Sequence, residues 1–139
     1  MRVILIFFVL LTFGCATGPT PMEAQVLTMA SVAVGLESKK NLDVDQLRKI
    51  SAILVDCKQI LLAALDDDPT TLPKVGNAFV ANVNPSYRAL INAAMGILVV
   101  RLQPALEAKD TALAAEYIEA VMGGAQTAVN DRIEYLETT

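Results

Sequence analysis

The sequence predicts an all-α fold, a small bundle of about four main helices plus one short helix, which follows a cleaved signal peptide. The chain of 139 residues is 54% hydrophobic, and alanine and leucine, which are strong helix formers, supply much of this share. Domains rich in β-strands favour aromatic residues, but the chain has only four Phe, three Tyr and no Trp. Apolar residues also recur at spacings of three and four along most of the chain, which is typical of amphipathic helices.

The chain begins with a positively charged residue, Arg2, which precedes a short apolar stretch over residues 3–13. As a helix, this stretch would be about 16 Å long, well short of the roughly 30 Å needed to cross a bilayer. Its length and its flanking charge are typical of the core of a secretory signal peptide. The alternative is a buried first helix of the domain, which would need a polar side that this stretch lacks.

Residues 11–15, with the sequence LTFGC, resemble the end of a bacterial lipoprotein signal peptide. The resemblance implies that cleavage occurs between Gly14 and Cys15 and that a diacylglyceryl group is attached to the Cys15 sulfur. Gly14 and Cys15 match the pattern of the family, whereas Thr12 and Phe13 stand where the family prefers leucine and a small residue. The predicted lipidation site is therefore Cys15.

The residue after this cysteine is Ala16 and not aspartate. In lipoproteins of double-membraned bacteria this implies transport to the outer membrane, so the resemblance implies an anchor there with the domain facing the periplasm. Two alternatives stay open. Ordinary signal-peptide cleavage after Ala16 would release a secreted protein, and an uncleaved leader would itself be the anchor.

We divide the chain into a signal peptide (1–14), a lipidated cysteine with a short tether (15–20) and a helical domain (21–139). The tether consists of small and turn-forming residues. Five extended residues reach at most about 18 Å. We therefore expect the domain to lie close to the lipid head groups.

The first helix is predicted to begin at Thr20 and Pro21 and to end near Ser38. Threonine is a good N-cap, proline is tolerated in the first turn, and Glu23 completes a capping box. The apolar residues that share one face, predicted to pack in the core, are Met22, Val26, Met29, Ala33 and Leu36. If the helix is loosely docked, this face is instead the candidate partner face, because a terminal helix near a membrane is able to move.

The second helix is predicted to begin at the capping residue Asp43, with Gln46 closing the box, and to end before Pro69. Its apolar stripe is Leu47, Ile50, Leu54, Cys57, Leu61 and Leu65. A short helix is predicted over residues 73–82.

Asn84 and Pro85 predict the start of a third long helix. Its residues 93–100 are almost all apolar, which predicts burial on more than one side, although a short core strand has the same pattern. Pro104 is predicted to kink or end this helix near Leu102.

The last helix is predicted to begin at the capping residue Asp110. Its apolar stripe is Leu113, Ile118, Met122, Ala125, Val129, Ile133 and Leu136. Gly123 and Gly124 lie in the middle of this pattern, and they indicate either a tight contact between helices or a break in the helix.

The composition argues against enzymatic chemistry. The chain has no histidine, which removes the commonest general base and the commonest metal ligand. It also lacks a phosphate-binding loop, a nucleophile elbow and paired cysteines. We expect no enzymatic activity, no cofactor and no metal site. Cys57 lies in a stripe of leucines, so we interpret it as a buried small hydrophobic residue and not as a reactive thiol.

Three acidic features have simpler interpretations than a site. The three aspartates at 66–68 precede a proline, which is typical of a solvated turn, although such a cluster can also hold a hard cation. Residues 41–45 imitate the start of a calcium loop, but the pattern fails at Gln46, where glycine is needed. Glu116 and Glu119 are spaced like an acid–base pair, yet they fit the outward face of an alanine-rich helix.

The net charge limits the classes of partner. It is −4 for the whole chain and becomes −5 once Arg2 is removed with the leader. An acidic domain without a basic cluster is poorly suited to nucleic-acid phosphates or to anionic lipids. We therefore expect no nucleic-acid partner, attachment to a membrane through lipid on Cys15, and a candidate protein partner in the envelope.

The leader, the short tether and the helical pattern together resemble the small helical lipoproteins of bacteria and of their phages or prophages. The resemblance implies a membrane-anchored, non-enzymatic protein with a structural or protein-interaction role, such as envelope assembly, lysis or phage exclusion. One alternative is a secreted or tethered module that binds a small apolar ligand or lipid in a cavity lined by Leu61, Leu98 and Met122. Another is an enzyme that uses carboxylates.

Overall fold

The computed structural model describes residues 20–39 and 41–138, so the predicted leader, its cleavage flank Gly14 and the predicted lipidation site Cys15 lie outside the described residues. The described chain is helical and contains no strand. Its elements are α2 (Pro21–Ser38), α3 (Val44–Asp67), the 3-10 turn η1 (Pro69–Thr71), α4 (Leu72–Ala81), α5 (Pro85–Glu107) and α6 (Thr111–Thr138). The prediction of an all-α bundle with four long helices and one short helix is confirmed.

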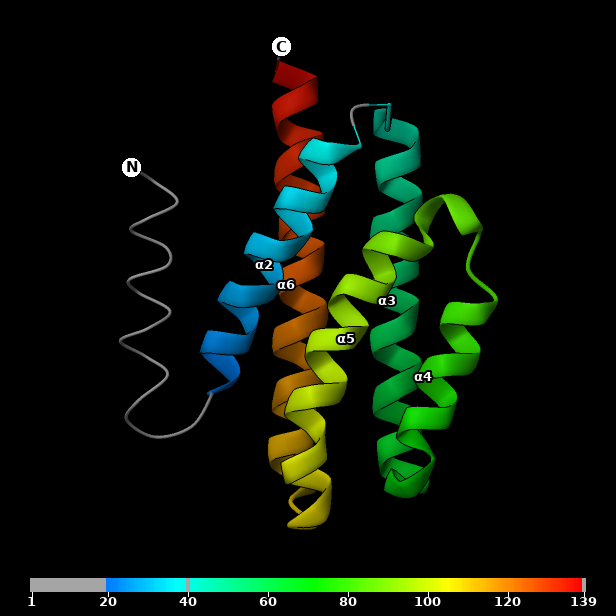
Figure 1. The fold of residues 1–139 in the computed structure, drawn as a ribbon, viewed down its shortest axis with the longest axis vertical. Helices are drawn as coiled ribbons and strands as arrows, with labels where there is room; N and C mark the ends of the chain where they lie inside the picture. The colour runs from blue at the N-terminus through cyan, green and yellow to red at the C-terminus, as the bar shows by residue number, and fades with distance from the viewer. Residues whose placement is uncertain (1–19, 40, 139) are drawn as a thin grey trace.

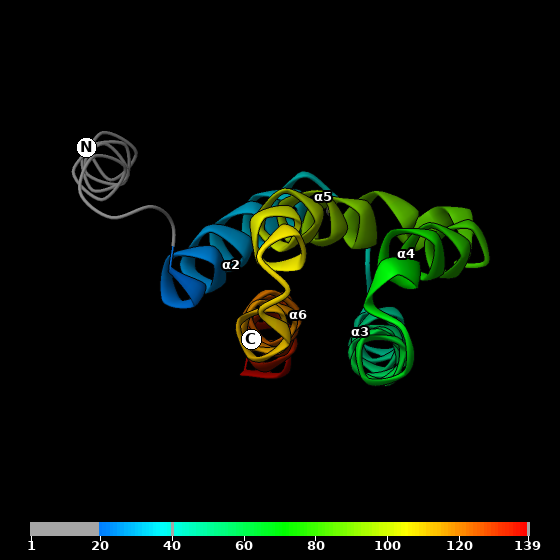
Figure 2. The same ribbon diagram turned by 90° about the horizontal axis from the view of Figure 1, so that it is seen from below.

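The helices form two layers (Figures 1 and 2). Helices α2, α5 and α4 lie side by side in one layer, and α6 and α3 form the other. Helix α6 is the centre of the bundle because it packs against α2, α3 and α5. Helix α4 lies at the end of the first layer away from α2, where it packs against α3 and α5. The apolar core lies between the two layers.

The predicted helix starts are confirmed by their capping hydrogen bonds. At the start of α2, the Glu23 N–H donates to the Thr20 hydroxyl at 3.3 Å and the Thr20 N–H donates to the Glu23 carboxylate at 3.4 Å. At the start of α3, the Gln46 N–H donates to Asp43 at 2.8 Å, and the Asp43 N–H donates to the Gln46 side chain at 3.0 Å. These bonds occupy backbone donors that have no partner inside the helix.

Side-chain caps also mark the starts of α5 and α6. The Ser86 N–H donates to the Asn84 side chain at 3.0 Å, ahead of α5. The Leu113 N–H donates to the Asp110 carboxylate at 3.0 Å, in the first turn of α6. The predicted short helix corresponds to α4, which follows directly after η1.

The predicted apolar stripe of α3 is the buried face of that helix. All six of its members are at most 3% exposed, namely Leu47, Ile50, Leu54, Cys57, Leu61 and Leu65. In α6 the central members of the stripe are buried, and Leu113, Ile133 and Leu136 are partly buried against the core. The sharp separation of apolar and polar sides on α3 explains why its periodicity identified the correct face.

The prediction for the core face of α2 is wrong. The residues that α2 buries are Ala24, Thr28, Val32 and Leu36. Of the predicted face, only Leu36 is among them, while Met22 and Val26 are 74% and 57% exposed. Residues 24–36 contain no charged side chain, so the helix is almost equally apolar on all sides and its periodicity fits more than one face.

A close approach of α2 to α6 selects the face that α2 buries. A Cβ atom built on Gly124 would lie 2.7 Å from the backbone oxygen of Gln25, which is closer than real Cβ contacts. Small side chains such as Ala24 therefore face α6 in this region, because larger ones would hold the two backbones apart. Helix α6 continues unbroken through Gly123 and Gly124, so the interpretation as a tight contact is correct, and it applies to Gly124.

Helix α5 differs from its prediction in two respects. Of the two effects predicted for Pro104, an end near Leu102 is wrong, because the helix continues through Pro104 to Glu107. Proline lies in the last turn of α5, where its ring removes only one hydrogen bond close to the helix end. The expected burial of residues 93–100 on more than one side is also wrong, because Val99 and Val100 are exposed.

Among the described helices, α5 is long and apolar enough by length and composition to span a membrane. A core helix of a bundle meets the same two conditions. Eight residues of α5 are buried, and the helix packs against α2, α4 and α6. Burial in the core therefore accounts for the apolar residues on the inner side of α5, whereas Val99 and Val100 are apolar and exposed.

Candidate functional site

The strongest predicted site, Cys15, lies outside the described residues, and so does the flank Gly14. The described chain begins at Thr20, the N-cap of α2, which follows Cys15 by five positions. The side chains nearest to the predicted anchor along the chain are therefore those of α2. Their arrangement defines the first candidate surface.

The α2 outer face is the name we give to the exposed apolar side chains of Met22, Val26, Ala33 and Val34. It includes three members of the predicted partner face, whereas Met29 is half-buried and Leu36 is buried. Val34 is 69% exposed but was not predicted, because its position does not fit the spacing of three and four residues that defines the predicted face. The absence of charge from residue 24 to residue 36 was the signal that could have found it.

Charged side chains are confined to the two ends of α2. At the N-terminal end, the Glu23 carboxylate accepts the Thr20 N–H of the capping box. At the C-terminal end, Glu37 is exposed, and the Lys39 ammonium donates to the Ser86 carbonyl at 3.1 Å. The α2 outer face is therefore an uncharged apolar surface bounded by charges only at the helix termini.

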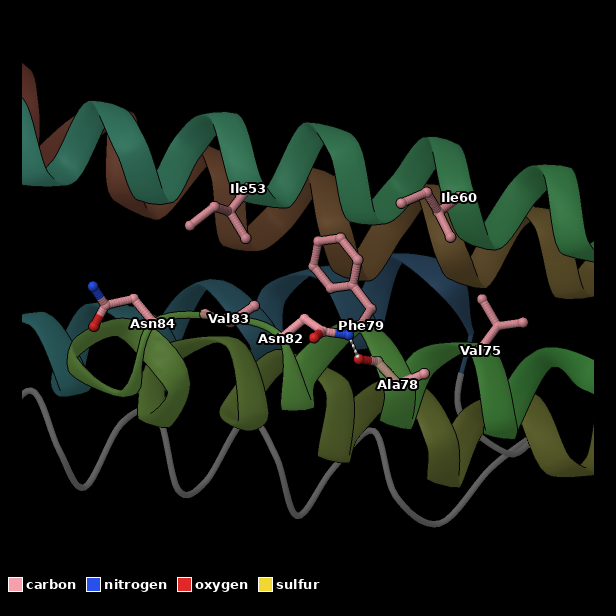
Figure 3. A pocket seen from close by; sticks show the side chains of 8 residues that line it. All are labelled: Ile53, Ile60, Val75, Ala78, Phe79, Asn82, Val83 and Asn84. Carbon is pink, nitrogen blue, oxygen red and sulfur yellow. Dashed lines mark hydrogen bonds between the residues drawn. The ribbon is translucent and has the colours of Figure 1, made fainter.

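A second apolar surface is a groove between α3 and α4 (Figure 3). Its volume is about 460 Å³, and its walls include Ile53 and Ile60 of α3 and Val75 and Phe79 of α4. The Phe79 ring projects between the two isoleucines (Figure 3). The sequence pattern does not predict the groove, because the walls of the groove come from the flanks of two helices outside their buried stripes.

The two asparagines at one end of this groove are occupied by local hydrogen bonds. The Asn82 side-chain amide donates to the Ala78 carbonyl at 2.9 Å. The Asn84 side-chain oxygen accepts the Ser86 N–H at the start of α5. Both side chains form hydrogen bonds with the backbone near the α4–α5 connection. The rest of the groove wall is apolar.

A smaller hollow of about 370 Å³ lies between α3, α4 and α5. Leu61 and Leu98, two of the three residues expected to line a ligand cavity, contribute to its wall together with Met95. The third, Met122, is buried inside the bundle on α6 and does not reach this hollow. Of the three residues, Leu61 and Leu98 therefore line this hollow and Met122 does not.

Cys57 is buried, as the α3 stripe predicts. It is 0% exposed and forms no disulfide, and its sulfur lies 3.9 Å from the Met95 sulfur. Burial disfavours the charged thiolate and raises the pKa of the Cys57 thiol to about 11. At neutral pH the side chain is therefore a protonated, inert part of the core.

The acidic features have local structural roles or face solvent. The Asp68 carboxylate accepts the Thr70 N–H at 3.1 Å and the Thr70 hydroxyl at 2.7 Å, which supports the interpretation of residues 66–68 as a turn. Glu116 and Glu119 are exposed on α6. Within residues 20–39 and 41–138, no group of three or more Cys, Asp or Glu side chains is placed to hold a metal ion.

No known protein family, curated protein or solved structure matches this chain.

Proposed function

We propose that this chain is a bacterial lipoprotein, held at a membrane by lipid on Cys15, whose helical domain has a structural or protein-interaction role. The position of α2 along the chain is the observation that carries the proposal. The capping box of Thr20 and Glu23 sets the start of α2, and the N-cap Thr20 lies five positions after Cys15. A lipid on Cys15 would therefore hold the domain directly at the membrane surface.

The length of the tether and the chemistry of the anchor support this placement. Five extended residues reach at most about 18 Å, which leaves little room between the head groups and the domain. Two or more acyl chains bind a bilayer stably, because each buried CH₂ contributes about 0.8 kcal/mol. The small residue Gly14 before Cys15, and Ala16 after it, favour a lipoprotein of the outer membrane that faces the periplasm.

The surfaces of the domain support a role in interaction. The α2 outer face and the α3–α4 groove are apolar, and the two asparagines at the end of the groove are engaged in local hydrogen bonds. Exposed apolar patches of this kind are typical of contacts with proteins or membranes. Envelope assembly, lysis and phage exclusion are roles of this kind.

Replacement of the predicted lipidation site tests the proposal. We expect Cys15→Ser to abolish labelling with a fatty-acid probe in the producing bacterium and to release the protein from the membrane fraction. The matched control is Cys57→Ala, which removes the other cysteine and should leave both labelling and membrane attachment intact. Labelling and membrane retention that survive in Cys15→Ser would contradict the proposal.

A second candidate function is the binding of a small apolar ligand or lipid. The hollow that Leu61 and Leu98 line favours it, because the wall is mainly apolar. Native mass spectrometry of the purified mature protein should then show a retained ligand, and its loss in Leu98→Phe would assign it to this hollow. Repeated absence of any bound mass would count against this function.

A further inference from the structure

Helix α2 presents apolar side chains to the outside of the bundle as well as to the core. Its inward side buries Ala24, Thr28 and Val32, while the α2 outer face carries Met22 and Val34 in exposed positions. A helix that is apolar on all sides is typically enclosed on all sides, by protein or by lipid. Within the described chain, α5 and α6 cover only the inner side of α2.

The position of α2 in the chain indicates what lies next to its outer side. Met22 is seven positions after Cys15, so the α2 outer face begins within the reach of the tether. The 18 residues of α2 span about 27 Å, at a rise of about 1.5 Å per residue. Met22 and Val34 are therefore about 18 Å apart along the helix axis. A surface that contacts both of them must extend along α2.

The charge distribution matches an uncharged apolar environment. No charged residue interrupts α2 between Glu23 and Glu37. Because the domain is acidic overall, its contact with a bilayer must come from apolar burial and not from attraction to anionic lipids. The α2 outer face meets this condition, since its exposed side chains are valine, methionine and alanine.

We propose that α2 lies flat on the bilayer, with the α2 outer face in the boundary between lipid head groups and acyl chains. The proposal rests on the lipid anchor at Cys15 proposed above. The anchor makes the contact effectively intramolecular, at an effective concentration of about millimolar or more. A patch of only a few apolar side chains is then sufficient to hold the helix against the membrane, and the orientation of the whole bundle follows from that contact.

Single tryptophan probes test this orientation, because the chain has no Trp of its own. The probes are Met22→Trp and Val34→Trp at the two ends of the α2 outer face, and the matched control is Gln59→Trp at an exposed position on α3. Each variant is purified as the processed full-length lipoprotein and reconstituted into phosphatidylcholine vesicles. Quenching is measured with phosphatidylcholine that carries bromine on its acyl chains.

We expect both α2 probes to lose most of their fluorescence in the brominated vesicles, while the Gln59→Trp control stays unquenched. In the background of Val26→Asp, which places a charge in the middle of the face, quenching of the Val34→Trp probe should fall. The change at Val26 is exposed, so it leaves the core intact.

Three outcomes would overturn the inference. Equal quenching of all three probes would mean that the bundle has no preferred orientation. Strong quenching of Met22→Trp alone would mean that α2 stands upright on its tether. Absence of quenching at both α2 positions, with dimers in cross-linking, would assign the face to a second copy. Intact mass measured on the same samples separates these results from a failure of the proposed function, because a protein without acyl mass contradicts the anchor itself.

Discussion

Helices α2 and α3 both begin with a capping box, but they differ in where their large apolar side chains lie. Helix α3 buries four leucines and an isoleucine and exposes charged residues such as Asp56. Helix α2 buries Ala24 and Thr28 near its start and exposes Met22, Val26 and Val34. The Thr28 hydroxyl donates to the Ala24 carbonyl at 2.7 Å, so this polar group is satisfied inside the bundle.

The difference indicates two ways of attaching a helix to a bundle. Helix α3 is held by the burial of large apolar side chains, each worth about 1.5–3 kcal/mol when fully removed from water. Helix α2 is held in part by a close approach of its backbone to α6 at Gly124. This second arrangement leaves the larger side chains of α2 available for contacts outside the domain.

The largest effect should come from truncating the buried side of α3. Leu54 is 2% exposed, so we expect Leu54→Ala to lower the free energy of unfolding by about 2–5 kcal/mol, through lost burial and the cavity left behind. The matched change on α2 is Val34→Ala. It should alter the free energy of unfolding by at most about 0.5 kcal/mol, because the Val34 side chain faces solvent. Chemical denaturation of the unlipidated Cys15→Ser chain measures both. Comparable losses for the two variants would mean that Val34 is covered within the domain.

A substitution at Gly124, with a smaller expected effect on stability, tests the close approach of α2 to α6. We expect Gly124→Ala to destabilise the domain by about 1–3 kcal/mol, because its Cβ would force the Gln25 backbone away. Gly123→Ala is the matched control, since a Cβ there meets nothing within 4 Å. It should stabilise the helix by about 0.5–1 kcal/mol. Thermal unfolding would contradict the close approach if both substitutions were stabilising.

The smallest expected effect is the difference in stability lost when the N-cap residue of α2 or of α3 is replaced. The bonds at Asp43 are 2.8 and 3.0 Å long, against 3.3 and 3.4 Å at Thr20. We expect Asp43→Ala to cost about 1 kcal/mol and Thr20→Ala to cost less, because the shorter bonds contribute more. Urea denaturation of the two variants measures which of them loses more free energy of unfolding. A greater loss in Thr20→Ala would contradict this expectation.

Local patterns were sufficient to predict much of the fold. The caps at Asp43, Asn84 and Asp110 were found because capping depends on residues within one turn of each other. The buried face of α3 was found because its polar side is clearly marked. In these places neighbouring residues decide the structure, so the sequence carries the information directly.

Elements that depend on distant contacts were not predictable in the same way. The buried side of α2 is selected by Gly124, about a hundred positions further along the chain. The α3–α4 groove arises where the flanks of two helices meet, and neither flank has a pattern of its own. The predicted end of α5 near Leu102 is wrong because the effect of Pro104 depends on its distance from the helix end, which the next element sets.

The most direct test of the account is the intact mass of the protein purified from bacterial membranes. We predict a chain that lacks residues 1–14 and begins at Cys15 with the added mass of at least two acyl chains. A chain that keeps Met1 and has no acyl mass would contradict the lipid anchor. It would also remove the basis for placing α2 on a bilayer.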